Sequence, residues 1–159
     1  MTPIAIDLDP RLDLVLERFV DVPPELVWRA WTTPALLEQW FCPKPWTTTD
    51  CEVDLRPGGA FRCVRRGPDG EAHPQDACYL EVIPNRRLVW TDALRPGFRP
   101  SGSPFITGIL LLEPEGTGTR YRAIARHSDE ALCTQHADMG FYDGWGTVAD
   151  QLVALMKHD

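Results

Sequence analysis

The sequence of 159 residues lacks the long apolar run that a membrane-spanning helix needs. Its longest unbroken aliphatic stretch is Ile109–Leu112, far short of the roughly 20 residues that cross a bilayer. The opening residues, MTPIAIDLDPRLDL, also lack the basic start and apolar core of a secretory signal. We therefore expect a cytoplasmic protein.

Basic charge is scarce as well. The 16 Lys and Arg residues face 23 Asp and Glu residues, which gives a formal net charge of −7. Nucleic acids and anionic membranes attract basic surfaces, so we expect neither as a partner. Apolar residues make up 43% of the chain and charged residues 25%, which excludes a disordered chain. We predict a single folded domain over residues 12–157, after an N-terminal lead-in at residues 1–11.

Paired cysteines and metal-binding motifs are missing too. The five cysteines form no CxxC motif, and their odd number leaves at least one unpaired. Without a secretory signal we expect free thiols, most of them buried as small apolar side chains. Neither HExxH nor His-x-His occurs, so no metal site is predicted. The cysteines are Cys42, Cys51, Cys63, Cys78 and Cys133.

Motifs for covalent catalysis and nucleotide binding are also absent. The only serines are Ser101, Ser103 and Ser128, and no GxSxG motif surrounds them. The run His127-Ser128-Asp129 contains the residue types of a catalytic triad, but a triad needs side chains that converge in space. No GxGxxG motif is present. We therefore assign no catalytic residue and no cofactor.

The pattern of apolar residues predicts an α+β fold. Alternation from Leu12 to Val22, which only Arg18 interrupts, indicates a half-buried strand. Pro24 and Pro34 each mark the first turn of a short helix, where a missing N–H costs nothing. The segment 95–104 reads as a loop. Six further strands are predicted, at residues 50–55, 60–66, 77–83, 87–93, 105–112 and 119–127.

The last thirty residues change to a helical period. Phe141, Trp145, Val148, Leu152 and Leu155 follow one another at spacings of four, three, four and three, which places them on one helix face. We predict a long C-terminal helix that begins after a cap in the run Ser128-Asp129 and packs on an antiparallel sheet.

Three glycines are unusual in such a helix, because each costs about 1 kcal/mol relative to alanine. Gly140, Gly144 and Gly146 indicate either close backbone packing or a kink, or room left for a ligand.

A curved sheet against one long helix leaves space for an apolar cavity, and the chain has six Trp and six Phe to line it. We expect the aromatic residues after the second short helix, together with Phe98, to rim the mouth. Asp92 and His127 share strand parity with apolar residues and are candidate polar groups inside; the alternative is a solvent-facing or strand-end position. The candidate cavity and mouth residues are Trp40, Phe41, Trp46, Phe61, Tyr79, Trp90, Phe98, Phe105, Phe141, Trp145 and Val148.

Five strings spread over the chain from about Leu12 to Met156 resemble a known superfamily. They are PPELVWRAWTTPALLEQWF, DLRPGGAFRC, YLEVIPNRRLVWTD, LLLEPEGTGTRY and HADMGFYDGWGTVADQLVAL. Their order resembles the START-like, or SRPBCC, superfamily with its helix-grip (Bet v 1-like) fold. Within it the chain is similar to stand-alone bacterial members of the activator of Hsp90 ATPase homologue 1-like (AHSA1-like) family.

This resemblance implies a curved antiparallel sheet of about seven strands wrapped on the C-terminal helix, with two short helices between the first two strands. It also implies a small apolar or aromatic ligand in the cavity. Because the superfamily hosts many functions, two alternatives stay open: a polyketide cyclase or hydratase-like enzyme using the same cavity, and a protein-interaction module such as a chaperone regulator in the stress response.

The partners implied by the family name need one distinction. The eukaryotic co-chaperone has a second, N-terminal Hsp90-binding domain, for which this chain has no room, so we do not expect Hsp90 activation.

The enzyme alternative can be tested by substitution. Loss of an activity in Asp92→Asn or His127→Gln, with ligand binding retained, would favour the enzyme. A homodimer is compatible with such a domain.

Overall fold

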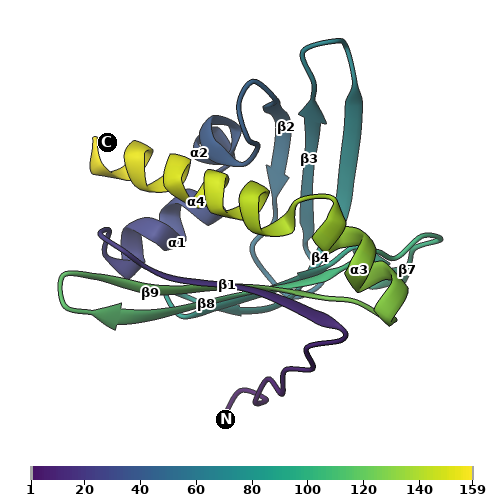
Figure 1. The fold of residues 1–159 in the computed structure, drawn as a ribbon, viewed down its shortest axis with the longest axis horizontal. Coiled ribbons are helices and arrows are strands. Elements are labelled where there is room, and N and C mark those ends of the chain that lie inside the picture. The colour runs from purple at the N-terminus through teal and green to yellow at the C-terminus, as the bar shows by residue number, and fades with distance from the viewer. Residues whose placement is uncertain (1, 159) are drawn as a thin grey trace.

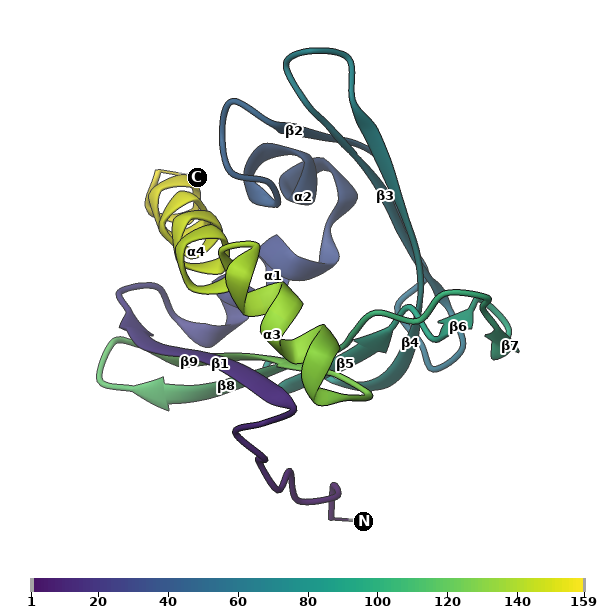
Figure 2. The same ribbon diagram turned by 45° about the vertical axis from the view of Figure 1, so that its right-hand side comes forward.

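The computed structural model describes residues 2–158 and contains one seven-stranded antiparallel sheet. Its strands lie side by side in the order β1-β9-β8-β5-β4-β3-β2. Figures 1 and 2 show the sheet curved around the helices, with β2 and β3 beside α2 and with β1, β8 and β9 beneath α4. The predicted α+β fold is therefore confirmed. The strands are β1 (Asp13–Val20), β2 (Thr47–Val53), β3 (Ala60–Arg66), β4 (Ala72–Ile83), β5 (Arg87–Thr91), β8 (Thr107–Glu115) and β9 (Gly118–Arg126).

Strand β1 shows why the alternating pattern worked. Leu14, Leu16 and Val20 are buried on the inner face. Arg18, the exception in the pattern, lies on the same face but reaches α4 (Phe141–Lys157), where its Nη1 is 2.7 Å from the Asp150 carboxylate. The charged residue thus ties the strand to the helix that the sheet holds.

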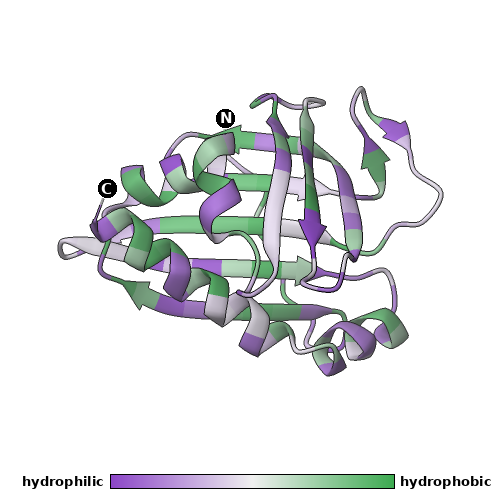
Figure 3. Cartoon of the chain, turned by 90° about the horizontal axis from the view of Figure 1, so that it is seen from above, coloured by the Kyte–Doolittle hydropathy of each residue, from purple (hydrophilic) through white to green (hydrophobic). Residues whose placement is uncertain are grey.

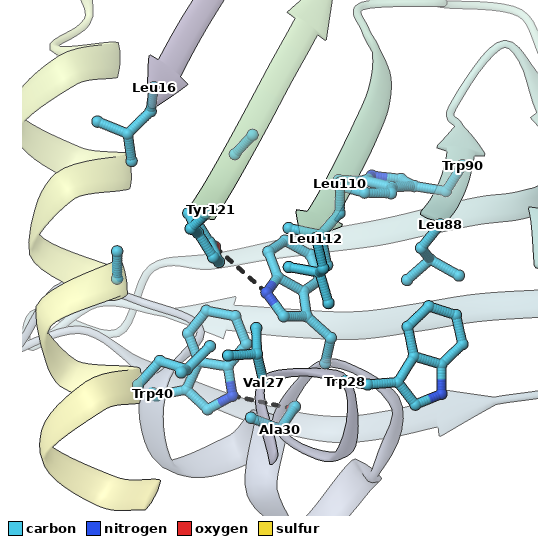
Figure 4. Packing of buried hydrophobic residues seen from close by; sticks show 14 of the residues in the cluster. Leu16, Val27, Trp28, Ala30, Trp40, Leu88, Trp90, Leu110, Leu112 and Tyr121 are labelled. Atoms are coloured by element: carbon cyan, nitrogen blue, oxygen red, sulfur yellow. Dashed lines mark hydrogen bonds between the residues drawn. The ribbon is translucent and has the colours of Figure 1, made fainter. Parts of the chain in front are cut away.

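Two short helices, α1 (Pro24–Thr32) and α2 (Pro34–Trp40), follow β1, and each begins at its proline as predicted. Trp40, expected near the cavity mouth, is instead the last residue of α2 and is only 1% exposed. Its indole Nε1 donates to the Ala30 carbonyl of α1 at 3.0 Å (Figure 4). Trp40 therefore belongs to the core between the two helices, where Trp31 packs on it edge to face.

Polar residues form strand segments that the sequence pattern did not predict. Strand β4 begins at Ala72 rather than residue 77, because its polar first half pairs with β3 from Arg66↔Ala72 onward. Backbone pairing needs no apolar alternation, so the sequence pattern gave no sign of it. The predicted loop at 95–104 contains a short hairpin of β6 (Leu94–Arg95) and β7 (Arg99–Pro100).

The C-terminal segment is two helices rather than one. Helix α3 (Glu130–Asp138) begins after Asp129, whose carboxylate accepts a hydrogen bond from the Leu132 amide at 2.8 Å. Gly140 then adopts a left-handed conformation with φ of 93°, which ends the first helix and precedes α4. Figure 3 shows apolar and polar residues following each other along α4 and along the sheet strands.

Residue Gln151 fixes α4 against the segment after α2. Its side-chain amide donates to the carbonyls of Trp40 and Cys42 at 3.0 and 2.8 Å. The lead-in has no helix or strand in residues 2–9, yet Ile6 packs on an apolar cluster that β5, β8 and β9 share. All five cysteines are free. None of the helices in the described chain is long and apolar enough to span a membrane.

Candidate functional site

A cavity of about 460 Å³ lies between the sheet and the two C-terminal helices. Residues from α1, β3, β4, β5, β9, α3 and α4 line it, together with the segments after α2 and after β5. Its walls combine aromatic and polar residues, and its mouth includes the exposed residues Arg95 and Met139. The aromatic side chains are Trp31, Phe41, Trp90, Phe105, Tyr121 and Trp145.

The aromatic walls are built by contacts between distant elements. The rings of Trp31 in α1 and Trp90 in β5 have centroids 5.2 Å apart, and Trp31 and Phe41 are 5.5 Å apart. Gly108 is the residue of β8 directly opposite Trp90, and a Cβ there would come within 2.2 Å of the indole. Glycine at this position therefore lets the Trp90 ring lie flat over the neighbouring strand.

The structure brings six of the predicted site residues to the cavity, and these are Phe41, Trp90, Asp92, Phe105, Trp145 and Val148. Three others pack behind its wall. Phe61 and Tyr79 stack on each other at 5.1 Å, and Phe141 packs on Trp145 at 4.6 Å.

The remaining predicted residues lie away from the lining. Trp40 is in the core, and Trp46 stacks on His73 outside the cavity at 5.6 Å between centroids. Phe98 is 53% exposed on the β6–β7 turn, where it covers Gly58. His127 lies behind the wall, where it is hydrogen-bonded to the lining residue His136. The proposed mouth of Trp40, Phe41, Trp46 and Phe98 therefore does not assemble, because these side chains have separate packing partners.

Asp92 lines the cavity but its carboxylate also organises the backbone. Its Oδ1 accepts hydrogen bonds from the amides of Phe105 and Ile106 at 2.7 and 3.1 Å. Burial raises the pKa of Asp92, and the two amide donors oppose that shift. The Ser101 hydroxyl donates to the Asp92 carbonyl at 2.6 Å. Asp92 therefore holds the segment between β5 and β8 in place.

A chain of hydrogen bonds links two buried histidines to the cavity. His127 Nδ1 is 2.7 Å from the Leu12 carbonyl, and His127 Nε2 is 2.9 Å from His136 Nδ1. A carbonyl can only accept, so Nδ1 of His127 carries the hydrogen, and in a neutral His127 Nε2 accepts from His136. Neutral His136 then has an unprotonated Nε2. Burial, together with His127 and Arg65, lowers the pKa of His136 to about 4.

Tyr121 and Trp31 form a second polar pair in the wall. The Trp31 indole donates to the Tyr121 hydroxyl at 3.2 Å (Figure 4). The indole nitrogen is only a donor, so the Tyr121 oxygen accepts, and its own hydrogen is left for another partner. Burial raises the pKa of Tyr121, which keeps the phenol protonated.

Arg65 is the half-buried cation of the lining. Its Nη2 donates to Gln75 Oε1 at 2.8 Å, and its guanidinium carbon lies 5.5 Å from the centre of the Phe41 ring. Within residues 2–158, no carboxylate lies within 4.0 Å of it. The nearby Asp76 carboxylate is paired with Arg62 at 2.8 Å.

Sequence reasoning missed Trp31, Arg65, Tyr121 and His136. A signal existed for Arg65, because it shares strand parity with the buried Phe61 and Cys63, and a cation on an apolar face is unusual. Tyr121 likewise shares parity with the buried residues of β9. The position of His136 depends on the break between α3 and α4 at Gly140. A single uninterrupted helix, as predicted, would place His136 elsewhere.

The cysteines sit outside the cavity lining. Cys51 and Cys63 lie at the irregularity between β2 and β3, and a hydrogen bond from the Cys51 thiol lowers the pKa of Cys63 while raising that of Cys51. Burial raises the pKa of Cys42, against contacts with Thr48 and Arg65. Within residues 2–158, no three His, Cys, Asp or Glu side chains gather as a metal site would need.

Several bacterial proteins of known structure share this architecture. A crystal structure of a protein from Nitrosomonas europaea is 46% identical and has a TM-score of 0.92, covering 95% of this chain and 97% of that one. A crystal structure from Chromobacterium violaceum is 27% identical, with a TM-score of 0.73 and coverage of 90% and 96%. One from Mycobacterium smegmatis is 26% identical, with a TM-score of 0.76 and coverage of 97% and 95%.

A comparison with curated proteins finds no match. The model of the family described as activator of Hsp90 ATPase homolog 1-like protein matches residues 21–157, most of the chain. The resemblance inferred from the sequence strings is thereby confirmed, and so is the fold that it implied. The chain belongs to the family of activator of Hsp90 ATPase homolog 1-like proteins.

Proposed function

We propose that this protein binds a small apolar or aromatic molecule in the cavity between the sheet and α4. The observation that carries the proposal is the cavity of about 460 Å³ with six aromatic side chains in its wall. Concave sites of this size, lined by aromatic groups with a few convergent polar atoms, are typical of small-molecule binding. Family membership supports the proposal at the level of the fold.

The two titratable candidates in the wall favour binding over a reaction. The Asp92 carboxylate accepts two backbone amides, so substitution of this residue tests the loop as much as any chemistry. His136 is held neutral by burial, with a pKa of about 4, which makes it a weak base at neutral pH. We therefore assign no reaction to the site.

Gly144 offers the sharpest test of the cavity. It lines the cavity, and a Cβ at this position would meet no atom within 4 Å. The side chain in Gly144→Leu would therefore occupy the open space from the α4 side. Thr147→Leu adds the same residue at an exposed position of α4 outside the cavity lining, which makes it a matched control.

The experiment is a fluorescence titration with N-phenyl-1-naphthylamine, a neutral probe that brightens in apolar surroundings. We expect saturable uptake by the wild type and by Thr147→Leu, and at least about tenfold weaker uptake by Gly144→Leu, which is about 1.4 kcal/mol of binding free energy. Absence of saturable uptake by the wild type, or equal uptake by all three proteins, would contradict the proposal.

A further inference from the structure

We infer that the cavity selects hydroxylated aromatic carboxylates, with the carboxylate paired to Arg65 and the hydroxyl donating to Nε2 of His136. This inference rests on the proposed function and specifies its ligand class. Two polar groups of opposite hydrogen-bonding character carry it, one a donor cation and the other a bare acceptor. Both line the same cavity.

The first step concerns the charge of Arg65. Its guanidinium has five N–H donors, and Gln75 Oε1 is the oxygen that the described chain places within hydrogen-bond distance. Arg65 is half-buried at the cavity and has no carboxylate within 4.0 Å in the described chain, so an anionic ligand would give it a charge-assisted partner. The planar guanidinium fork fits a carboxylate with two parallel hydrogen bonds.

The other charges of the lining do not compete for the ligand in this way. Asp76 is already paired with Arg62, and Asp92 Oδ1 accepts two backbone amides. The remaining cation, Arg95, is exposed at the mouth. With Arg62 counted beside its partner Asp76, the formal charges of Arg62, Arg65, Arg95, Asp76 and Asp92 sum to +1, which favours an anion over a cation.

The second step concerns the hydrogen of His136. When His127 is neutral, the bonds from Leu12 through His127 place the His136 hydrogen on Nδ1, so Nε2 is an acceptor. His136 is 8% exposed, lines the cavity, and its Nε2 has no hydrogen-bond partner within residues 2–158. His136 lines the cavity, so a ligand hydroxyl that enters it can donate to this acceptor.

The third step concerns the body of the ligand. Trp31, Trp90 and Trp145 present broad flat rings, and the Phe105 ring lies 4.9 Å from that of His136. Aromatic rings pack favourably on such walls in offset or edge-to-face arrangements. An aromatic scaffold carrying the two polar groups therefore matches the cavity better than a flexible chain.

The test measures dissociation constants at pH 8, where an ordinary imidazole is neutral. The probes are 2-naphthoate, its neutral analogue 2-naphthamide, and the 5-, 6- and 7-hydroxy isomers of 2-naphthoate. Trp31, Trp90 and Trp145 make intrinsic fluorescence quenching a suitable readout. Three hydroxyl positions are needed because the hydroxyl must reach His136 while the carboxylate stays at Arg65.

For the wild type we expect 2-naphthoate to bind at least about tenfold tighter than 2-naphthamide, as a charge-assisted hydrogen bond implies. Arg65→Met keeps the aliphatic cover on Phe41 and should abolish this preference. Arg66→Met, at the exposed neighbour that pairs with Asp50, should retain it. If the wild type binds both probes equally, the inference is overturned whether or not the variant folds.

For the second group we expect one hydroxy isomer to bind several-fold tighter than 2-naphthoate, and His136→Phe to remove that gain. His73→Phe changes an exposed histidine outside the cavity lining and should leave the gain in place. No gain from any isomer, or a gain that survives His136→Phe, would overturn the assignment of His136.

The outcome also separates this inference from the proposed function. If the neutral naphthylamine probe binds and the carboxylates show no preference, the cavity binds ligands but the inference is wrong. If neither the neutral probe nor any naphthoate binds the wild type, the proposed function fails together with the inference.

Discussion

The substitution Gly144→Ala should stabilise the protein, although the residue lies beside the proposed ligand. Glycine in a helix interior costs about 1 kcal/mol relative to alanine, since it loses more backbone freedom on folding. The added Cβ would meet no atom within 4 Å, so no steric penalty offsets the gain. We expect the free energy of unfolding to rise by about 1 kcal/mol, and the melting temperature by about 2–4 °C.

The neighbouring Gly146 supplies the comparison. A Cβ there would lie 2.9 Å from Arg18 Nη2, so the guanidinium that pairs with Asp150 must shift. Arg18 is flexible and its ion pair is partly exposed, worth about 0–1 kcal/mol, so the shift should cancel most of the helix gain. Gly146→Ala should therefore leave stability nearly unchanged.

Urea denaturation followed by tryptophan fluorescence and by circular dichroism measures both variants against the wild type. The reasoning requires Gly144→Ala to be the more stable of the two. Destabilisation of Gly144→Ala, or a gain smaller than that of Gly146→Ala, would show that the space beside Gly144 is not open. The cavity would then not extend to Gly144 of α4.

Three further predictions concern stability. Asp129→Ala removes the cap of α3 and should lower the free energy of unfolding by about 1 kcal/mol in urea titrations, whereas an unchanged midpoint would show that the cap is dispensable. Trp40→Ala should cost about 3–5 kcal/mol, and Trp46→Ala much less; equal melting temperatures would contradict the core position of Trp40. The unfolded chain protonates His136 near pH 6.5 but the folded chain only near pH 4, so stability should fall as pH drops through this window, by roughly 3 kcal/mol in total. In urea titrations, the free energy of unfolding of the wild type should therefore fall more steeply between pH 6.5 and pH 4 than that of His136→Gln. The same pH dependence in both proteins would refute the lowered pKa of His136.

The order of the elements could be predicted from the sequence because each had a local signal. Alternation marked β1, and the prolines at positions 24 and 34 marked the starts of α1 and α2. Where a strand is polar, as in the first half of β4, its pairing comes from the backbone and left no pattern to read. The break at Gly140 depends on a left-handed backbone, which the helical spacing alone does not reveal.

The candidate site could be predicted only in part, for a different reason. Parity and spacing tell which face a residue occupies, so Trp90, Trp145 and Val148 were found. They do not tell whether a buried aromatic residue lines a cavity or fills the core, and Trp40 and Phe61 do the latter. That distinction depends on how closely the helices approach the sheet, which is a property of the whole fold.

The three glycines of the C-terminal region have different surroundings. Gly140 breaks the helix, as expected for a kink, and Gly146 makes room for the side chain of Arg18. Gly144 instead borders open space in the cavity wall. The three glycines, although close together in the sequence, therefore each have a separate structural reason.

The indole N–H signals of the six tryptophans test the location of binding most directly. In a two-dimensional ¹H–¹⁵N spectrum, assigned through single Trp→Phe variants, 2-naphthoate is titrated into the protein. We predict that the signals of Trp31, Trp90 and Trp145 move and saturate together, because these rings line the cavity. Signals that stay still throughout, or shifts confined to Trp28 and Trp46, would contradict the assignment of the cavity as the binding site.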